Sequence, residues 1–282
     1  MPVPGGVVNA FTVDTEEWFH ICGVEALGAS RWPALPSRIE LTTNLLLEDM
    51  DRGGIRGTFL VVGWIAERYP HIVRRILAAG HEIGSHGHLH TRAFEMTPDA
   101  FTDDLRQSLR ALADAGATDV RCYRAPEWSI NERSLWALSE LAANGIAIDA
   151  SMAPLRLVGS TGFPRRPHIR QTPAGPIVEV PPLVADRYGQ VMPMGWGWGL
   201  RMTAPARVRR AIEQANAAGQ PAVVTVHPWE IDPQPPAVRL PMRLRFAHYF
   251  RLDGFRERLK EVMKHPGFGT LSEAARSAGS SI

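Results

Sequence analysis

The stretch Glu82-Ile83-Gly84-Ser85-His86-Gly87-His88-Leu89-His90 joins a short apolar run to three of the ten histidines in the chain. The run predicts a strand over Glu82–Ser85, so the histidines follow its carboxyl end. Histidines four positions apart lie on one side of a helical turn, where two imidazole nitrogens can hold a divalent ion. The same spacing turns His88 away from His86 and His90, which predicts a place behind the ligands or at the surface. A metal site needs a further ligand from elsewhere in the chain.

The N-terminal segment Asn9-Ala10-Phe11-Thr12-Val13-Asp14-Thr15-Glu16-Glu17 begins as an apolar strand and ends in acids. In a strand, Asp14 and Glu16 project to the same face and Glu17 projects to the opposite one. Two carboxylates on one face suit a metal ligand and a group that moves protons. A solvated strand end before a helix is the plainer interpretation of these acids, and the histidine cluster argues against it.

Two later segments each deliver a polar side chain to the end of an apolar run. Cys122-Tyr123-Arg124-Ala125-Pro126-Glu127-Trp128-Ser129 places Arg124 on a stiff, proline-containing turn. Ala222-Val223-Val224-Thr225-Val226-His227-Pro228-Trp229 is typical of a buried β-branched strand, with His227 at its carboxyl end. A rim ion pair for Arg124 and a structural cap for His227 are the plainer alternatives.

In this order, the four segments resemble the motifs of the polysaccharide deacetylase family, carbohydrate esterase family 4. The resemblance spans roughly residues 7–230, and the order of the four motifs is specific although each motif alone is weak. It implies an α/β fold, a deformed (β/α)7-type barrel, with the site at the carboxyl ends of the strands. It also implies hydrolysis of the acetamide of an amino sugar with a divalent metal ion, for which Zn2+ is the expected cofactor.

The family draws a base and a metal ligand from its first motif, commonly from adjacent acids, whereas this chain has Asp-x-Glu. Because Asp14 and Glu16 share a strand face, we assign Asp14 as the general base and Glu16 as a metal ligand. His86 and His90 complete the metal triad, which leaves coordination positions open. Glutamate in place of aspartate is a departure from the family, so Glu17 stays an alternative ligand.

Three further roles follow from the resemblance. Arg124 pairs with the base and keeps its carboxylate ionised. The backbone N–H of Glu127, where the family usually has tyrosine, donates a hydrogen bond to the oxyanion. His227 is the general acid that protonates the leaving amine. The acid that orients His227 stays open among three candidates: Asp149, Glu230 and Asp232.

Composition bounds the class of protein. A chain of 282 residues with 45% hydrophobic content is normal for one barrel with insertions. A formal net charge of +2 gives no reason to expect a nucleic-acid partner. Cys22 and Cys122 form neither a disulfide framework nor a metal-spaced pair. No apolar run approaches the ~20 residues that a bilayer requires. The N-terminus lacks a signal pattern, so we expect a cytoplasmic protein with no integral membrane segment.

Strand-like runs alternate with helical patterns, which is typical of a parallel α/β fold. We expect a catalytic barrel over residues 1–230 and a C-terminal extension packed on it over residues 231–282, similar to the extension in an exopolysaccharide-associated branch of the family. The predicted strands are Val7–Val13, Arg56–Val62, Glu82–Ser85, Ile146–Asp149, Pro176–Val180 and Ala222–Val226. The predicted helices are Arg38–Asp51, Tyr69–Ala79, Pro98–Ala115, Asn131–Asn144, Pro205–Ala218 and Phe255–Met263.

Between Ala153 and Arg201 the pattern dissolves into Pro-, Gly- and Arg-rich sequence, which indicates a long functional loop. Within it, Gly195-Trp196-Gly197-Trp198-Gly199 places two aromatic rings on a flexible stretch. The flat faces of Trp196 and Trp198 suit the C–H faces of sugar rings, and ordinary packing is the alternative. Further candidates for lining the cleft are Trp18, Phe19 and Trp128.

The sequence therefore predicts a metal-dependent N-deacetylase that acts on an N-acetylated amino-sugar oligomer or polymer, or on its lipid-linked precursor. The cytoplasmic location favours the precursor. One alternative is a metal-independent amidohydrolase of the same fold that opens a small cyclic amide, and Glu16, His86 and His90 argue against it. The other is an inactive sugar-binding module, against which Asp14 and His227 argue.

Overall fold

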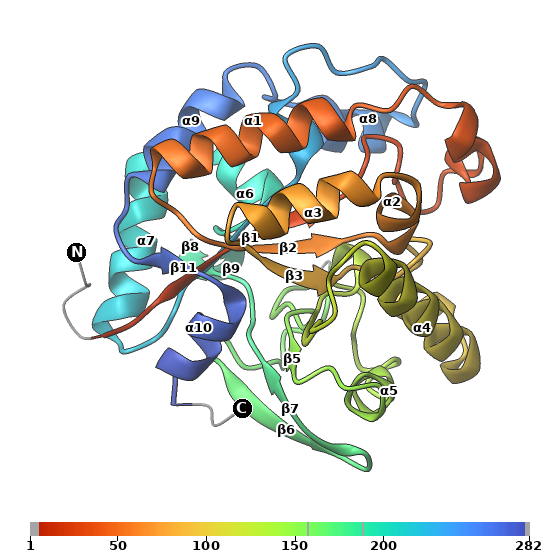
Figure 1. Cartoon of the computed structure of the whole chain (residues 1–282). Coiled ribbons are helices and arrows are strands. Elements are labelled where there is room, and N and C mark those ends of the chain that lie inside the picture. Colours follow the sequence, from red (N-terminus) through yellow and green to blue (C-terminus); the bar gives the residue numbers. More distant parts are fainter. Residues whose placement is uncertain (1–5, 157, 188, 280–282) are drawn as a thin grey trace.

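The centre of the molecule is a nine-stranded sheet in which most neighbouring strands run parallel (Figure 1). A computed structural model describes residues 6–156, 158–187 and 189–279. From one edge to the other the sheet contains β10 (Val223–Val226), β1 (Asn9–Thr15), β2 (Thr58–Val61), β3 (Glu82–Ser85), β4 (Cys122–Tyr123), β5 (Ile148–Asp149), β7 (Gly175–Glu179) and the antiparallel β6 (His168–Thr172). The short strand β11 (Phe268–Gly269) also pairs with β1.

The parallel strands are short and apolar because both faces of the sheet are covered. All seven residues of β1 and all four of β10 are buried, as expected for strands beneath helices on both sides. The register pairs Asp14 with Leu60, Val61 with Ser85, and Ser85 with Tyr123. The carboxyl ends of these strands therefore meet at one edge, where the four sequence motifs converge.

Helices cover the sheet and connect its strands (Figure 1). They are α1 (Ile39–Arg52), α2 (Gly63–Arg68), α3 (Pro70–Ala78), α4 (Pro98–Asp114), α5 (Ala137–Ala143), α6 (Gly197–Met202), α7 (Pro205–Ala217), α8 (Met242–Tyr249), α9 (Phe255–Met263) and α10 (Leu271–Ser277). Short 3-10 turns are η1 (Glu25–Leu27), η2 (Ala29–Ala34), η3 (Ala93–Glu95), η4 (Pro126–Trp128) and η5 (Pro228–Ile231). The side chain of Thr97 caps α4 by accepting a hydrogen bond from Ala100 N, and Pro98 is the first helical residue.

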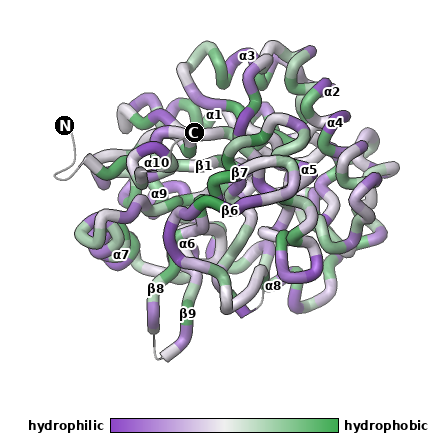
Figure 2. Tube along the Cα trace, turned by 90° about the horizontal axis from the view of Figure 1, so that it is seen from below, coloured by the Kyte–Doolittle hydropathy of each residue, from purple (hydrophilic) through white to green (hydrophobic). Residues whose placement is uncertain are grey.

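The barrel closes irregularly beyond β7. Leu183 N donates to Val223 O at 3.3 Å, and Thr225 N donates to Gly195 O at 2.6 Å, so the segment that follows β7 lies beside β10. Between these contacts the chain leaves the barrel as a hairpin of β8 (Val184–Arg187) and β9 (Gln190–Pro193), which projects from the body in Figure 2. The predicted deformed (β/α) barrel is therefore confirmed.

Most predicted elements are present, with ends shifted by one or two residues, and two predictions are wrong. The helix predicted from Asn131 begins only at Ala137, because Asn131 and Ser134 form a hydrogen-bonded turn in its place. The long stretch 153–201 is not structureless, since it contains the β6–β7 and β8–β9 hairpins and α6. Gly195–Gly199 is accordingly no flexible loop: α6 begins at Gly197.

The C-terminal segment packs against the barrel through three helices. Phe255 and Leu259 of α9 are buried in the main core, and α10 buries Leu271 against β1 and β5. The predicted division at residue 230 stays a prediction. Within the described residues, no helix combines the length and the apolar character needed to cross a membrane.

Candidate metal centre and active site

Glu16, His86 and His90 converge at the carboxyl ends of β1 and β3. One ligand atom from each residue lies within 4.8 Å of the other two, and all three residues are buried. Glu16 Oε2 lies 2.5 Å from His90 Nε2 and 3.9 Å from His86 Nε2. Two imidazoles and one carboxylate form a donor set typical of zinc enzymes.

The histidines meet through a loop, so the helical explanation of their spacing was wrong. Gly87 and His90 both have positive φ angles, +73° and +52°, which fold the chain back on itself. Asp104 of α4 stabilises this loop, because its carboxylate accepts hydrogen bonds from His88 N at 2.7 Å and Leu89 N at 2.9 Å. A left-handed residue in a tight turn brings the two imidazoles together.

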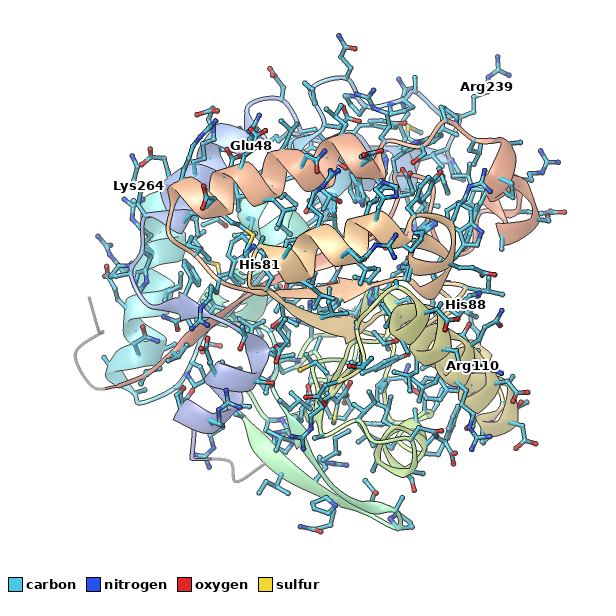
Figure 3. All side chains as sticks on the ribbon, viewed as in Figure 1. Glu48, His81, His88, Arg110, Arg239 and Lys264 are labelled. Carbon is cyan, nitrogen blue, oxygen red and sulfur yellow. The ribbon has the colours of Figure 1, made fainter. Side chains whose placement is uncertain are left out.

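His88 is buried, lies beside α4 in Figure 3 and is not part of the Glu16–His86–His90 cluster. Its Nε2 lies 3.6 Å from Glu67 Oε2, and its ring packs against Gly63 at the start of α2. A Cβ atom on Gly63 would lie only 2.6 Å from His88 Nδ1. His88 therefore supports the loop from behind and is not at the surface.

Neighbouring groups orient the ligand atoms. His86 Nδ1 lies 2.7 Å from the carbonyl oxygen of Arg124, to which it donates, so its Nε2 is left as a lone pair facing the cluster. Trp229 Nε1 donates to Glu16 Oε1 at 3.0 Å, which leaves Oε2 for the imidazoles. Burial lowers the pKa of His86 to about 4. Burial alone would raise the pKa of Glu16, but nearby His90 and His227 outweigh it and lower that pKa below its usual range.

These residues fit a divalent cation. A metal ligand must be unprotonated, and the hydrogen bond from His86 to Arg124 already selects the correct tautomer. Glu16 is the acid of the triad and would supply one negative charge to a bound cation, to which His86 and His90 would bind as neutral imidazoles. Such a set can hold a divalent cation while leaving positions open for water and substrate.

Glu17 lies outside the cluster, on the opposite face of the chain. Its carboxylate accepts hydrogen bonds from Arg38 N at 3.0 Å and Ile39 N at 3.2 Å, at the N-terminus of α1, and from the hydroxyl of Ser37. It therefore satisfies free N–H groups of that helix. β1 ends at Thr15, so Glu16 and Glu17 both lie beyond the strand, and strand alternation does not explain why Glu16, and not Glu17, meets the histidines.

Asp14 and Arg124 form a buried ion pair beside the cluster. Arg124 is fully buried, and its Nη1 donates to Asp14 Oδ1 at 2.6 Å and to Thr12 Oγ1 at 3.0 Å. Its Nε donates to the carbonyl oxygen of Ala150 at 3.0 Å, which fixes the guanidinium plane. The second oxygen of Asp14, Oδ2, lies 3.9 Å from His227 Nε2, so this oxygen faces the imidazole of His227.

Glu127 lies on a strained turn at the edge of the site. Its φ is +52° and that of Trp128 is +51°, a conformation that costs about 1–3 kcal/mol for each non-glycine residue. No described residue accepts a hydrogen bond from Glu127 N–H. The side chain of Glu127 instead accepts one from Arg92 Nε at 2.7 Å. The turn thus leaves the backbone N–H of Glu127 free to donate, while the carboxylate of Glu127 pairs with Arg92.

Glu230 is the acid that contacts His227. His227 Nδ1 donates to Glu230 Oε2 at 2.9 Å, and Arg201 Nε lies 3.0 Å from Glu230 Oε1. Burial lowers the pKa of His227, but Glu230 and then Glu16 outweigh it and raise it to about 9. The other two candidates have different partners: Asp232 pairs with Arg38 at 2.7 Å, and Asp149 accepts a hydrogen bond from Ser151 at 2.5 Å.

A pocket of about 350 Å³ opens above these groups and has aromatic walls. Trp196 is only 8% exposed and lies 4.6 Å from the ring of Trp128, whereas Trp198 is 37% exposed. Trp18 and Phe19 belong to a separate apolar cluster with Leu27 and Trp32. The aromatic residues that line the pocket are Trp128, Trp196, Trp198 and Trp229.

Sequence patterns did not single out several residues of the site. His20 stacks on the ring of His90 at 5.7 Å, and Arg201 reaches Glu230 from α6. The ring of His248, from α8, stacks on Trp229 at 4.3 Å. The sequence does give a signal for Trp229, which lies two residues after His227. It gives none for Arg201 and His248, because both are distant in sequence from every motif.

Two family models match the chain. Residues 36–146 match the family described as Polysaccharide deacetylase, and residues 150–276 match a Domain of unknown function (DUF3473). A peptidoglycan-N-acetylglucosamine deacetylase from Bacillus cereus is 27% identical to the chain over 99 residues. The match covers 35% of the chain and 36% of that relative, so it spans about a third of the relative's length.

Solved structures share the fold. A protein from Mycobacterium smegmatis, assigned as a polysaccharide deacetylase, aligns with a TM-score of 0.64 and 21% identity over 99% of this chain and 93% of its own. An allantoinase, Puue, aligns with a TM-score of 0.58 and 16% identity over 98% and 91%. At these identities the likenesses establish the barrel and leave the chemistry to the site itself.

Proposed function

Because the chain belongs to the polysaccharide deacetylase family, we propose that it is a metal-dependent N-deacetylase that hydrolyses the acetamide of N-acetylated amino sugars. The proposed substrate is a bacterial polysaccharide or its lipid-linked precursor. The observation that carries the proposal is the convergence of three groups on one pocket: the Glu16–His86–His90 cluster, the Asp14–Arg124 pair and the His227–Glu230 pair.

Glu16, His86 and His90 would hold the cation, with Zn2+ as the proposed ion. When bound, the ion would polarise the amide carbonyl and lower the pKa of a nearby water molecule. Asp14 is the proposed general base that takes a proton from the attacking water. Arg124, whose Nη1 lies 2.6 Å from Asp14 Oδ1, orients that carboxylate.

Glu127 and His227 are the residues that we assign to the developing charge and to the leaving group. The N–H of Glu127 is the proposed donor to the oxygen that becomes negatively charged in the transition state. His227 Nε2 faces the pocket because its Nδ1 is bound to Glu230, so it is placed to protonate the departing amine. These two donors and the base Asp14 line the same pocket.

The pocket supports an amino-sugar substrate. Its volume of about 350 Å³ is at the small end for ligand sites, which suits one sugar ring with its acetamide group. Aromatic rings on its walls suit the apolar faces of such a ring. The name of the Bacillus cereus relative specifies an N-acetylglucosamine unit, in agreement with this substrate class.

Elemental analysis combined with turnover tests the proposal. The purified protein should contain about one divalent ion per chain and release acetate from short N-acetylglucosamine oligomers. Asp14→Asn and His227→Ala should each keep the metal and lose about 10²–10⁴-fold in kcat, the usual share of general acid–base catalysis. His90→Ala should lose the metal itself, whereas His71→Ala, at an exposed position, should change neither quantity.

Two results would contradict the proposal. A metal-free protein that opens a small cyclic amide would be the amidohydrolase alternative. Binding of sugar oligomers with no turnover in the metal-loaded wild type would make the chain a sugar-binding module. The role in exopolysaccharide synthesis, the cytoplasmic location and the domain division at residue 230 stay predictions.

A further inference from the structure

The segment that contains α8 is strongly basic. Residues 233–252 contain no aspartate or glutamate. They contain four arginines that are exposed: Arg239, Arg243, Arg245 and Arg251. Among the described residues, no carboxylate forms an ion pair with any of the four guanidinium groups, and the acids that flank the segment in sequence are Asp232 and Asp253. Figure 3 shows Arg239 pointing away from the body of the protein into solvent. The positive charge on this face is therefore available to an outside partner.

Large apolar side chains are exposed on the same face. Met242 is 85% exposed and Phe246, one turn later on α8, is 48% exposed. Trp198 and Met202 occupy the corresponding spacing on α6 and are 37% and 44% exposed. These four account for half of the eight large apolar side chains that are exposed in the described part of the chain.

The two helices present one continuous surface. The rings of Trp198 and Phe246 lie 5.2 Å apart, and Phe250 lies 4.4 Å from Phe246. We call this surface the α6–α8 patch; it comprises Trp198, Met202, Met242, Phe246 and the four arginines. Single exposed apolar residues are normal on a protein surface, whereas a cluster of them marks an interaction site.

The α6–α8 patch borders the mouth of the candidate active site. Leu244, Ala247 and His248 of α8 line the pocket, while Met242 and Phe246 of the same helix are exposed to solvent. Trp198 belongs to both the pocket and the patch. Whatever binds the patch therefore lies next to the opening through which substrate enters.

We propose that the α6–α8 patch docks the protein on an anionic lipid bilayer. Protruding Met and Phe side chains with arginines near them suit a membrane interface, where apolar groups enter the acyl boundary and cations stay at the headgroups. A soluble polyanion would use the arginines but leave Met242 and Phe246 in water. That a lipid-linked substrate is then presented to the pocket rests on the proposed function.

Vesicle sedimentation with the full chain tests the docking. The protein should sediment with vesicles of phosphatidylglycerol and phosphatidylcholine, and binding should weaken with added salt and be much lower on phosphatidylcholine alone. Each arginine near an anionic surface contributes a factor of about five to the partition constant. The triple variant Met242→Ser, Arg243→Gln, Arg245→Gln should therefore lower that constant by at least about 25-fold.

A matched control lies on another exposed segment, near β6. Ile169 is 46% exposed and has Arg166 and Arg170 beside it, so Ile169→Ser, Arg166→Gln, Arg170→Gln changes the net charge and the apolar surface in the same way. This control should bind vesicles like the wild type. Melting temperatures verify folding, and Arg243→Gln with Arg245→Gln alone serves if the triple variant is unstable.

Three results would overturn the docking. They are no sedimentation of the wild type with anionic vesicles, an equal loss in the control variant, or binding to soluble dextran sulfate that matches vesicle binding and does not depend on Met242. Binding is measured without turnover, so its failure leaves the deacetylase proposal standing. Conversely, a wild-type protein that sediments with anionic vesicles but does not deacetylate amino sugars would contradict only the proposed function.

Discussion

At the residue scale, Trp196 and Trp198 are two positions apart yet have different surroundings. Trp196 is buried against Trp128 in an apolar cluster, whereas Trp198 stands at the rim of the pocket. We expect Trp196→Ala to lower the free energy of unfolding by about 3–5 kcal/mol, because a large buried ring is removed. Trp198→Ala should instead raise KM with little change in kcat, since stacking on a sugar stabilises ground and transition states equally.

Urea denaturation and steady-state kinetics on N-acetylglucosamine oligomers distinguish these two effects. Trp136→Ala is a control, because this half-buried ring packs on Phe101, away from the pocket, and its loss should not change KM. An unchanged KM in Trp198→Ala would remove this ring from substrate binding. A Trp196→Ala protein with an unchanged free energy of unfolding would show that neighbouring side chains fill the space that the indole ring leaves.

At the element scale, Arg201 joins α6 to the end of α8 and to η5. Its Nη2 donates to Ala247 O at 2.7 Å and its Nη1 to His248 O and Phe250 O at 3.0 Å, which satisfies carbonyl groups at the C-terminus of α8. Because lysine cannot reproduce this fork, Arg201→Lys should lower the free energy of unfolding by about 2–4 kcal/mol. Hydrogen exchange should rise selectively in α8.

Arg209→Lys is the matched control for this substitution. Arg209 is half-buried and contacts the backbone and side chain of Glu261, so a lysine there should change stability by less than about 0.5 kcal/mol. Uniformly faster exchange along the whole chain in Arg201→Lys would mean that Arg201 supports the barrel in general. Unchanged exchange in α8 would contradict the cap.

At the scale of the whole molecule, the buried pair Asp149 and Glu179 makes stability depend on pH. The two carboxyl groups come from neighbouring strands β5 and β7, whose register pairs Asp149 with Glu179, and both residues are fully buried. Burial and then the charge of Asp149 raise the pKa of Glu179 well above 4.5. The folded chain thus binds a proton that the unfolded chain has released, so the contribution of this group to stability is fully present below pH 4.5 and falls as the pH rises towards the folded pKa.

Glu179→Gln should reduce this fall, because the amide cannot ionise. In the wild type, one such proton contributes a slope of up to about −1.4 kcal/mol per pH unit over that range. Urea denaturation at several pH values between about 5 and 8 measures the slope. Glu213→Gln, at an exposed position on α7, should leave it unchanged. Identical slopes in wild type and Glu179→Gln would show that Glu179 releases its proton over the same pH range in the folded and in the unfolded chain.

Local sequence was sufficient for the strands and for part of the site. β-Branched and apolar runs predicted β1, β3 and β10 because such strands are buried on both faces of a parallel sheet. The order of the four motifs predicted their meeting point, because parallel strands bring their carboxyl ends to one edge.

The tertiary structure alone decided which groups touch. It selected Glu230 over Asp149 and Asp232 as the partner of His227, and it brought Arg201 and His248 into the site from elements outside every motif. It also joined His86 to His90 through a left-handed loop where the spacing indicated a helical turn. Periodicity reports contacts within one element, whereas these contacts depend on how separate helices and loops pack against each other.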